Sequence, residues 1–200
     1  MVNAMTDPDT IRENVQRMLA HLPEGVELVA AAKTRTPAEV IAAIGAGVRH
    51  VGHNYVQEAA DCIESVGRNS CCWHMIGHLQ RNKAKKATEL FDLVETVDST
   101  RLADALERAC EAKGMVMPVL IEINSGREPQ KAGILPEELD TLVEHVLSLP
   151  HLRIEGLMTM GPFGAGEDEL RRCFRTTRLL FEQLQRQLDN GPRILSMGMS

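Results

Sequence analysis

The chain alternates short apolar runs with amphipathic segments, and this alternation limits what it can fold into more than any other feature. Each apolar run has the length of a strand, and in the segments between them apolar residues recur every three or four positions, as in a helix. The expected strands are residues 26–32, 48–54, 71–78, 91–97, 116–126, 152–160 and 193–200. Strands that alternate with helices form a parallel sheet, since each helix returns the chain to the edge where the next strand begins.

The predicted helices carry start signals of their own. A leading helix is expected over residues 9–22, ahead of the first strand. Two later helices open at Pro37 and Pro136, because proline fits the first helical turn, where its missing N–H is not needed. Asp98 or Ser99 caps the helix after the fourth strand, since a short polar side chain there accepts a hydrogen bond from a free backbone N–H.

The number of strand–helix units selects between two parallel architectures. Seven units without a glycine-rich dinucleotide loop favour a closed barrel over an open doubly wound sheet. No linker of biased composition divides the chain, so one domain over residues 1–200 is expected. An eight-stranded barrel typically needs about 250 residues. The predicted fold is therefore α/β, a (β/α)8 barrel whose last strand and helix are missing from this chain.

Composition excludes several classes of partner. The formal net charge is −6 and basic and acidic residues are intermixed, which argues against nucleic acid. The sequence shows no secretory signal, and no apolar run approaches the roughly 18–20 residues that span a bilayer. The five cysteines are odd in number and lack CxxC spacing, which fits reduced thiols in a cytoplasm. No long apolar surface helix stands out, so a monomer is expected.

Lys33 is the first candidate for chemistry. It follows the first apolar run, at the carboxyl edge of the predicted sheet, where α/β proteins bind ligands. One interpretation is a side chain that extends from a strand end to solvent. The other is a desolvated amine that forms a Schiff base with an aldehyde. The residues around Lys33 leave both interpretations open.

Polar residues also end the other strands, and a barrel would bring them to one mouth. They are His53, Asn54, His74, His78, Asp98, Asn124, Thr159 and the serine–glycine turn from Ser196 to Ser200. A lysine, an amide and such a turn suit a phosphorylated aldehyde, because the lysine forms the imine and the turn offers N–H and hydroxyl groups to phosphate. Every barrel mouth is polar, however, so this set does not identify a ligand by itself.

Seven stretches of the sequence, which together cover nearly the whole chain, match the motifs of one family and occur in the same order. They are AAAKTRTP (30–37), GHNYVQE (52–58), WHMIGHLQRNKAKK (73–86), ETVDS (95–99), IEINSGREPQKAGI (121–134), GLMTM (156–160) and LSMGMS (195–200). In these stretches the chain resembles the pyridoxal phosphate homeostasis proteins, small single-domain relatives of the N-terminal alanine racemase barrel.

This resemblance implies a cofactor and a role for individual residues. It implies that Lys33 binds pyridoxal 5'-phosphate as an internal aldimine. It places Asn54 beside the cofactor ring and Met160 near the ring face. The residues that it implies for the phosphate are Ser196, Gly198 and Ser200. The implied protein manages the intracellular supply of the cofactor without an established reaction, and apo-enzymes that use pyridoxal phosphate are its expected recipients.

The chain departs from the family pattern in two places. His53 stands where the family motif GENYVQE has glutamate, which changes charge and hydrogen bonding next to Asn54. The chain also lacks the later VRIG-type segment, which in the family completes the phosphate cradle and carries an arginine facing the pyridine nitrogen. Either the sequence is incomplete or the chain is a truncated form, and a truncated form would have an open barrel edge. A barrel that has lost its cofactor is one alternative function.

An enzyme is the other alternative. A racemase that uses pyridoxal phosphate needs acid–base groups on both faces of the imine, and Lys33 could serve only one. Tyr55, the single tyrosine, belongs to the family motif, and the sequence shows no arginine clamp for a substrate carboxylate. A cofactor carrier without catalytic residues is therefore the leading prediction, with an amino-acid racemase or another pyridoxal enzyme as the alternative.

Several further clusters receive a structural interpretation. The histidines at positions 50, 53, 74 and 78 invite a metal, but their spacing does not place all four on one strand face, and no metal is expected. Cys71 and Cys72 are adjacent, point to opposite faces of a strand, and are expected to pack in the core. The loop over residues 126–133 is expected to be solvated, with Lys131 exposed.

Overall fold

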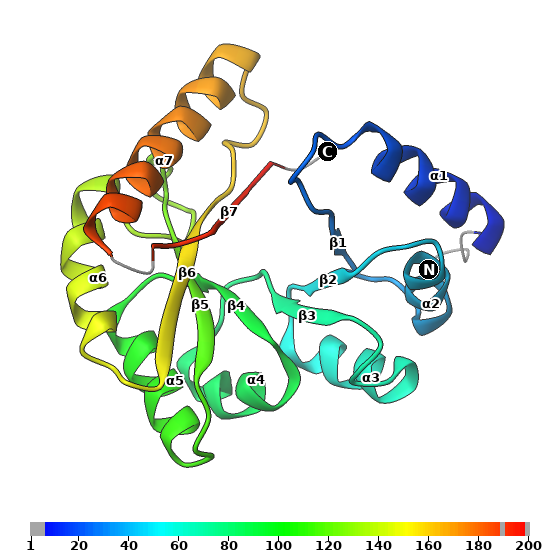
Figure 1. Cartoon of the computed structure of the whole chain (residues 1–200), viewed down its shortest axis with the longest axis horizontal. Helices are drawn as coiled ribbons and strands as arrows, with labels where there is room; N and C mark the ends of the chain where they lie inside the picture. The colour runs from blue at the N-terminus through cyan, green and yellow to red at the C-terminus, as the bar shows by residue number, and fades with distance from the viewer. Residues whose placement is uncertain (1–6, 189–190, 199–200) are drawn as a thin grey trace.

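The computed structural model describes residues 7–188 and 191–198, in which seven strands form one parallel sheet in chain order. The strands are β1 (Val29–Ala31), β2 (His50–His53), β3 (Cys72–Met75), β4 (Leu93–Val97), β5 (Met117–Glu122), β6 (Leu152–Thr159) and β7 (Ile194–Met197). The sheet is curled, helices cover its outer side, and β1 and β7 form its two edges (Figure 1). The predicted parallel α/β architecture is confirmed as a curled part of a barrel, with seven of its strands in the described residues.

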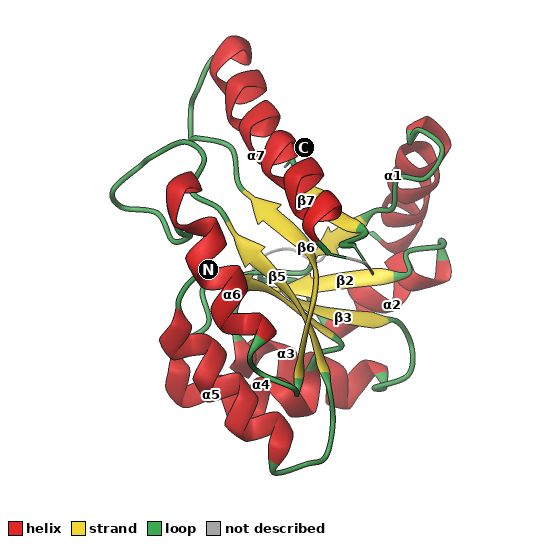
Figure 2. Cartoon of the chain, turned by 60° about the vertical axis from the view of Figure 1, so that its left-hand side comes forward, coloured by secondary structure: helices red, strands yellow, loops and turns green. Residues whose placement is uncertain are grey.

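The helices lie between the strands as the alternation predicts. They are α1 (Pro8–His21), α2 (Pro37–Gly45), α3 (Val56–Val66), α4 (Ala84–Leu90), α5 (Thr100–Glu111), α6 (Leu139–Leu147) and α7 (Glu167–Gln187), with 3-10 turns η1 (Arg81–Lys83) and η2 (Pro136–Glu138) ahead of α4 and α6. The last of them, α7, lies along β6 and β7 (Figure 2). None of the helices in the described ranges is long and apolar enough to cross a membrane.

The predicted helix starts are largely confirmed. Pro37 begins α2, and a capping box precedes it, in which Thr36 accepts from the Glu39 N–H and Glu39 accepts from the Thr36 N–H. Ser99 caps α5, since its Oγ accepts a hydrogen bond of 3.3 Å from the Leu102 N–H. Pro136 opens the 3-10 turn η2, and α6 itself begins three residues later.

The two faces of the sheet carry different cores. Side chains alternate along a strand, so neighbouring residues face opposite sides. Val94, Val119 and Leu157 belong to the large cluster that packs the sheet against the helices. The inner face holds a smaller apolar cluster made of Leu93, Leu120, Met158 and the partly buried Met160. The rest of the inner face is therefore open to polar side chains, and the candidate functional groups lie there.

All seven strands are shorter than the apolar runs that predict them, and the difference is three residues or more in the first, third and fifth, among others. The first run spans residues 26–32 but pairs only over Val29–Ala31. The run over 71–78 leaves the sheet after Met75, and the run over 116–126 leaves it after Glu122. The segments that continue past β3 and β5 turn over the carboxyl edge of the sheet, where they line a cavity.

Candidate functional site

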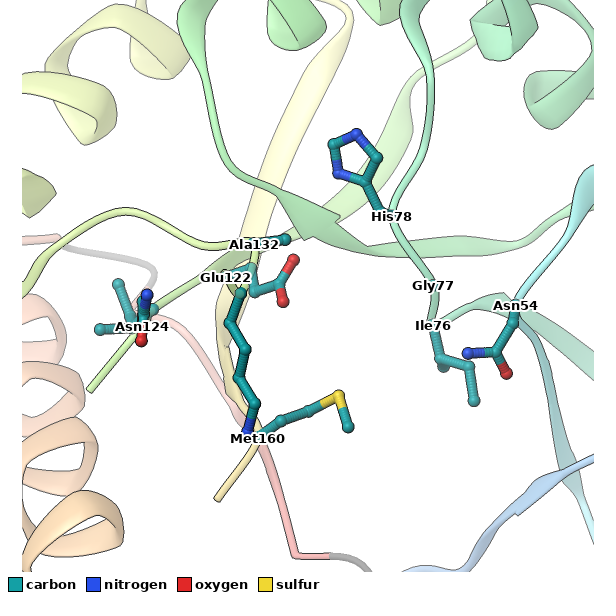
Figure 3. A pocket seen from close by; sticks show the side chains of 10 residues that line it. Asn54, Ile76, Gly77, His78, Glu122, Asn124, Ala132 and Met160 are labelled. Atoms are coloured by element: carbon teal, nitrogen blue, oxygen red, sulfur yellow. The ribbon is translucent and has the colours of Figure 1, made fainter. Parts of the chain in front are cut away.

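A cavity of about 200 Å³ opens at the carboxyl ends of the strands (Figure 3). Its lining comes from segments that follow β2, β3, β5 and β6, and consists of Asn54, Ile76, Gly77, His78, Glu122, Ile123, Asn124, Lys131, Ala132 and Met160. The prediction that polar strand ends share one mouth is confirmed for Asn54, His78 and Asn124. Met160 contributes an apolar wall beside them.

Gly77 allows the segment after β3 to approach Asn54. A Cβ atom on Gly77 would lie 2.4 Å from the backbone oxygen of Asn54 and 2.6 Å from its Cα. Both atoms belong to the backbone, so no side-chain rotation could relieve the contact. The absence of a side chain at position 77 therefore sets the position of Asn54 at the rim of the cavity.

Replacing Gly77 by alanine is expected to lower the free energy of unfolding by about 1–3 kcal/mol, the usual cost of overpacking. Urea denaturation of the variant and the wild-type protein measures it. The matched control is Gly45→Ala in α2, where a Cβ would meet nothing within 4 Å. That change should be neutral or stabilising by up to about 1 kcal/mol, because alanine is the better helix former. Equal stability of Gly77→Ala and wild type would contradict the close approach.

The loop after β5 folds over the cavity. Asn124 Nδ2 donates to the Glu128 carbonyl at 2.8 Å, and the Glu128 N–H donates back to Asn124 Oδ1 at 3.1 Å. Lys131 pairs with the Glu128 carboxylate at 2.6 Å and donates to the Gly161 carbonyl at 2.8 Å. The prediction of an exposed Lys131 is wrong, because these partners hold it against the cavity and leave a quarter of its side chain accessible.

Glu122 is the buried acid of the cavity. The residue is 7% exposed, and its Oε2 has no hydrogen-bond partner in the described structure. Burial, aided by the negative charge of Asp98, raises the pKa of Glu122 to about 7. Asp98 in turn lies 3.3 Å from His78 Nδ1. Sequence reasoning missed Glu122 inside an apolar run, although it shares strand parity with Asn124, which would have placed both on the inner face.

Lys33 lies at the same edge of the sheet but outside the lining of this cavity. It follows β1, is exposed, and its Nζ is 5.9 Å from the centre of the Tyr55 ring. In the β1–β2 register Ala31 pairs with Gly52. The chain turns just after this pair, where the Arg35 N–H donates to the Ala32 carbonyl at 3.0 Å, and Lys33 lies in that turn. The lysine thus extends to solvent, as one interpretation predicts, and lies near the ring of Tyr55, which follows Asn54 in the sequence.

Two of the three residues predicted for the phosphate, Ser196 and Gly198, lie in or just after the opposite edge strand. Ser196 is in β7, and its Oγ donates to Glu95 Oε2 at 2.6 Å. Gly198 follows β7 with a φ of 93°, a conformation that favours glycine. Ser200 lies outside the described residues. Of the six predicted cofactor residues, the structure therefore brings Asn54 and Met160 into one cavity, while Lys33 lies outside its lining, near Tyr55.

Three residues expected at the mouth lie elsewhere, His53 and Thr159 on the outer face and His74 deeper on the inner face. His53 is 1% exposed, stacks on Trp73 with ring centres 5.8 Å apart, and has no partner for either ring nitrogen in the described structure. It lines a second cavity, of about 360 Å³, on the helix side of β2. Thr159 also faces outward and bonds to the Ile123 carbonyl, while His74 lies deeper on the inner face. His53, which stands where the family has glutamate, therefore points to the opposite face of the sheet from Asn54, since successive side chains alternate.

A chain of hydrogen bonds crosses the inner face below the mouth. His50 Nδ1 is 3.0 Å from His74 Nε2, and His74 Nδ1 is 2.5 Å from Glu95 Oε1. Burial alone would lower the pKa of His74, but hydrogen bonds to Cys72 and Glu95 outweigh it and raise the pKa to about 9. Burial and the charge of His74 lower the pKa of His50.

Comparison with known proteins identifies the family. The model of the alanine racemase N-terminal domain matches residues 6–200. The pyridoxal phosphate homeostasis protein of Haemophilus influenzae is 40% identical over 179 residues, which are 88% of this chain and 75% of that protein. The chain is a member of this family. The homeostasis protein of Aquifex aeolicus is 34% identical, with coverage of 100% of this chain and 89% of that one.

Solved structures agree with this membership. PipY of Synechococcus elongatus, a member of the same fold family, has been solved without PLP and with PLP bound. The two structures match this chain with TM-scores of 0.89 and 0.86 at 34% and 33% identity, and each match covers 95% of this chain and 89% of PipY. Alanine racemase of Bacillus anthracis has a TM-score of 0.81 at 18% identity over half of its length, which shows a common fold.

Proposed function

We propose that this chain binds pyridoxal 5'-phosphate covalently through Lys33 and serves in the intracellular supply of that cofactor. The observation that carries the proposal is the place of Lys33 just after β1, at the carboxyl edge of the sheet, with its Nζ 5.9 Å from the ring centre of Tyr55, the residue that follows Asn54. The relatives named as pyridoxal phosphate homeostasis proteins support it, as does PipY with PLP bound.

The residues at the edge suit each part of this ligand. The Lys33 amine adds to the aldehyde carbon, a C=N bond forms, and the aldehyde oxygen leaves as water. Ile76 and Met160 give apolar surface for the ring, and the Asn54 amide lies at the same rim. Ser196 and Gly198 are proposed for the phosphate together with Ser200, because hydroxyls and a left-handed glycine turn present donors to anions.

A carrier fits these residues better than a racemase does. A racemase moves protons on both faces of the bound imine. Tyr55 is 53% exposed and lies beside Lys33. It is therefore on the same side as the lysine and does not supply a group for the opposite face of the imine. We propose a cytoplasmic monomer that releases the cofactor to apo-enzymes, whose approach the exposed position of Lys33 permits.

The test mixes the purified chain with pyridoxal phosphate and follows the visible absorbance. Carrier function predicts a new band that borohydride reduction removes, and no racemisation of L-alanine when the two enantiomers are resolved afterwards. Racemisation that depends on Lys33 would favour the enzyme. Absence of any band would favour a barrel that has lost its cofactor.

A further inference from the structure

A second cluster of potential ligands lies on the inner face, outside the cavity at the mouth. His50 begins β2, while Cys72 and His74 lie in β3. One ring nitrogen of each histidine and the Cys72 sulfur all lie within 4.8 Å of one another. The two facing nitrogens, His50 Nδ1 and His74 Nε2, are 3.0 Å apart. Two imidazoles and a thiol therefore converge on one point.

The strand register creates this convergence. His50 pairs directly with Cys72 across the β2–β3 ladder. His74 is two residues beyond Cys72 and so points to the same face. Cys71 is the neighbour of Cys72 and points to the other side. The convergence was missed from the sequence because it needs the register of two strands, which the spacing of the histidines alone does not reveal.

Carboxylates orient both histidines toward the common point. The outer nitrogen of His50, Nε2, is 3.0 Å from Glu27 Oε2. The outer nitrogen of His74, Nδ1, is 2.5 Å from Glu95 Oε1. Histidines that bind metals almost always donate their second N–H to such a group, which fixes the tautomer and makes the ligating nitrogen more basic. In this cluster both histidines have that partner, and their inner nitrogens face each other at 3.0 Å.

We propose that His50, Cys72 and His74 bind a zinc ion, with solvent in the fourth position. Nitrogen and thiolate ligands suit Zn²⁺, and three protein ligands with one open position are common around it. Tetrahedral zinc separates its ligand atoms by roughly 3.3–3.7 Å. The two nitrogens, 3.0 Å apart, would need to separate slightly, and the Cys72 sulfur lies within 4.8 Å of each of them. The ion takes the place of the proton shared by the two nitrogens and of the Cys72 thiol proton, and both are released to solvent.

The site is separate from the proposed cofactor residues. His50 precedes Asn54 by four positions along the same segment, which corresponds to about 13 Å in an extended strand. Metal binding in this cluster does not rest on the proposed function, and it needs neither Lys33 nor pyridoxal phosphate. A link between the two sites exists in Glu95, which contacts His74 with one oxygen and Ser196 with the other.

Cobalt titration of the full chain, freed of cofactor, tests the proposal. Co²⁺ bound through Cys72 gives a thiolate-to-metal charge-transfer band in the near ultraviolet, which should saturate at one ion per chain and disappear when Zn²⁺ is added. Competition with a chelator should give a zinc dissociation constant of about 1 μM or tighter, a binding free energy of about −8 kcal/mol. The expected band in Lys33→Ala is unchanged, which separates this site from the cofactor site.

Matched variants locate the ligands. Cys72→Ser should lose the charge-transfer band, whereas Cys71→Ser, altered one residue away on the other face, should keep it. His50→Gln and Glu27→Gln should weaken zinc binding, the latter by about 10- to 100-fold. Far-ultraviolet circular dichroism checks that each variant is folded. The absence of the band in the wild-type protein, or its persistence in folded Cys72→Ser, would overturn the proposal, and if Cys72→Ser does not fold, unaltered zinc affinity in His50→Gln would do so.

Discussion

The Lys33→Ala variant is expected to lose all of the visible absorbance that pyridoxal phosphate gains when mixed with the wild-type protein. The reason is chemical, because a methyl group cannot form an imine with the aldehyde. The structure suggests that folding will survive the change, since Lys33 is exposed and its one described contact is with the exposed Tyr55 ring. Absorbance spectra of both proteins, before and after borohydride reduction, provide the measurement.

Lys131 supplies the matched control for this experiment. It is the lysine that lines the cavity, where Glu128 and the Gly161 carbonyl hold it. Lys131→Ala should retain the band, and mass mapping of the reduced wild-type protein should place the label on Lys33. A label on Lys131, or a band that persists in Lys33→Ala and disappears in Lys131→Ala, would mean that Lys131, in the loop after β5, binds the cofactor covalently in place of Lys33.

Much of the fold was predictable because strand–helix alternation is a property of local sequence. The strands occur where apolar runs predict them, and Ser99 and Pro37 lie at the predicted helix starts. Strand ends were harder to predict because apolar residues continue beyond the sheet. Ile76 and Ile123 extend their runs in sequence but line the cavity in the fold. After β3 the chain closely approaches another segment, at Gly77 and Asn54, a contact that local sequence does not reveal.

The residues of the candidate site were predictable only where the end of a single strand determines whether a residue lines the cavity. Asn54 and Met160 lie in the cavity as expected. His53 and Thr159 were expected beside them, but each is one residue away from an inward-facing position, and alternation turns both toward the helices. Which of two adjacent residues faces inward depends on the register with the neighbouring strand, and that register is set by contacts distant in sequence.

Glu122 is expected to make the protein less stable as the pH rises. Its pKa in the folded protein is about 7, above the ordinary value of 4.5, because burial and the charge of Asp98 disfavour the carboxylate. The folded state therefore holds the proton more tightly than the unfolded state does. The stability that this proton provides is fully present below about pH 4.5 and is lost as the pH rises through 7.

Glu122→Gln should remove this dependence, because an amide keeps the shape of the protonated acid and does not ionise. The variant should match the wild-type protein near pH 4.5 and exceed its free energy of unfolding by on the order of 2–3 kcal/mol above pH 8. Urea denaturation at both pH values measures the difference, with the exposed Glu64→Gln of α3 as the control for the substitution itself. A constant difference between variant and wild type across this range would mean that Glu122 stays in one ionisation state throughout.

The same titration bears on the proposed ligand. Glu122 faces the cavity, and a carboxylate there would repel the phosphate and phenolate charges of pyridoxal phosphate, whereas the protonated acid offers a hydrogen-bond donor. Cofactor affinity of the wild-type protein should therefore fall between pH 6 and pH 8, on either side of the Glu122 pKa of about 7, by more than that of Glu122→Gln. If both proteins lose affinity in parallel, the loss belongs to the cofactor's own ionisation or to Lys33, and Glu122 contributes to stability alone.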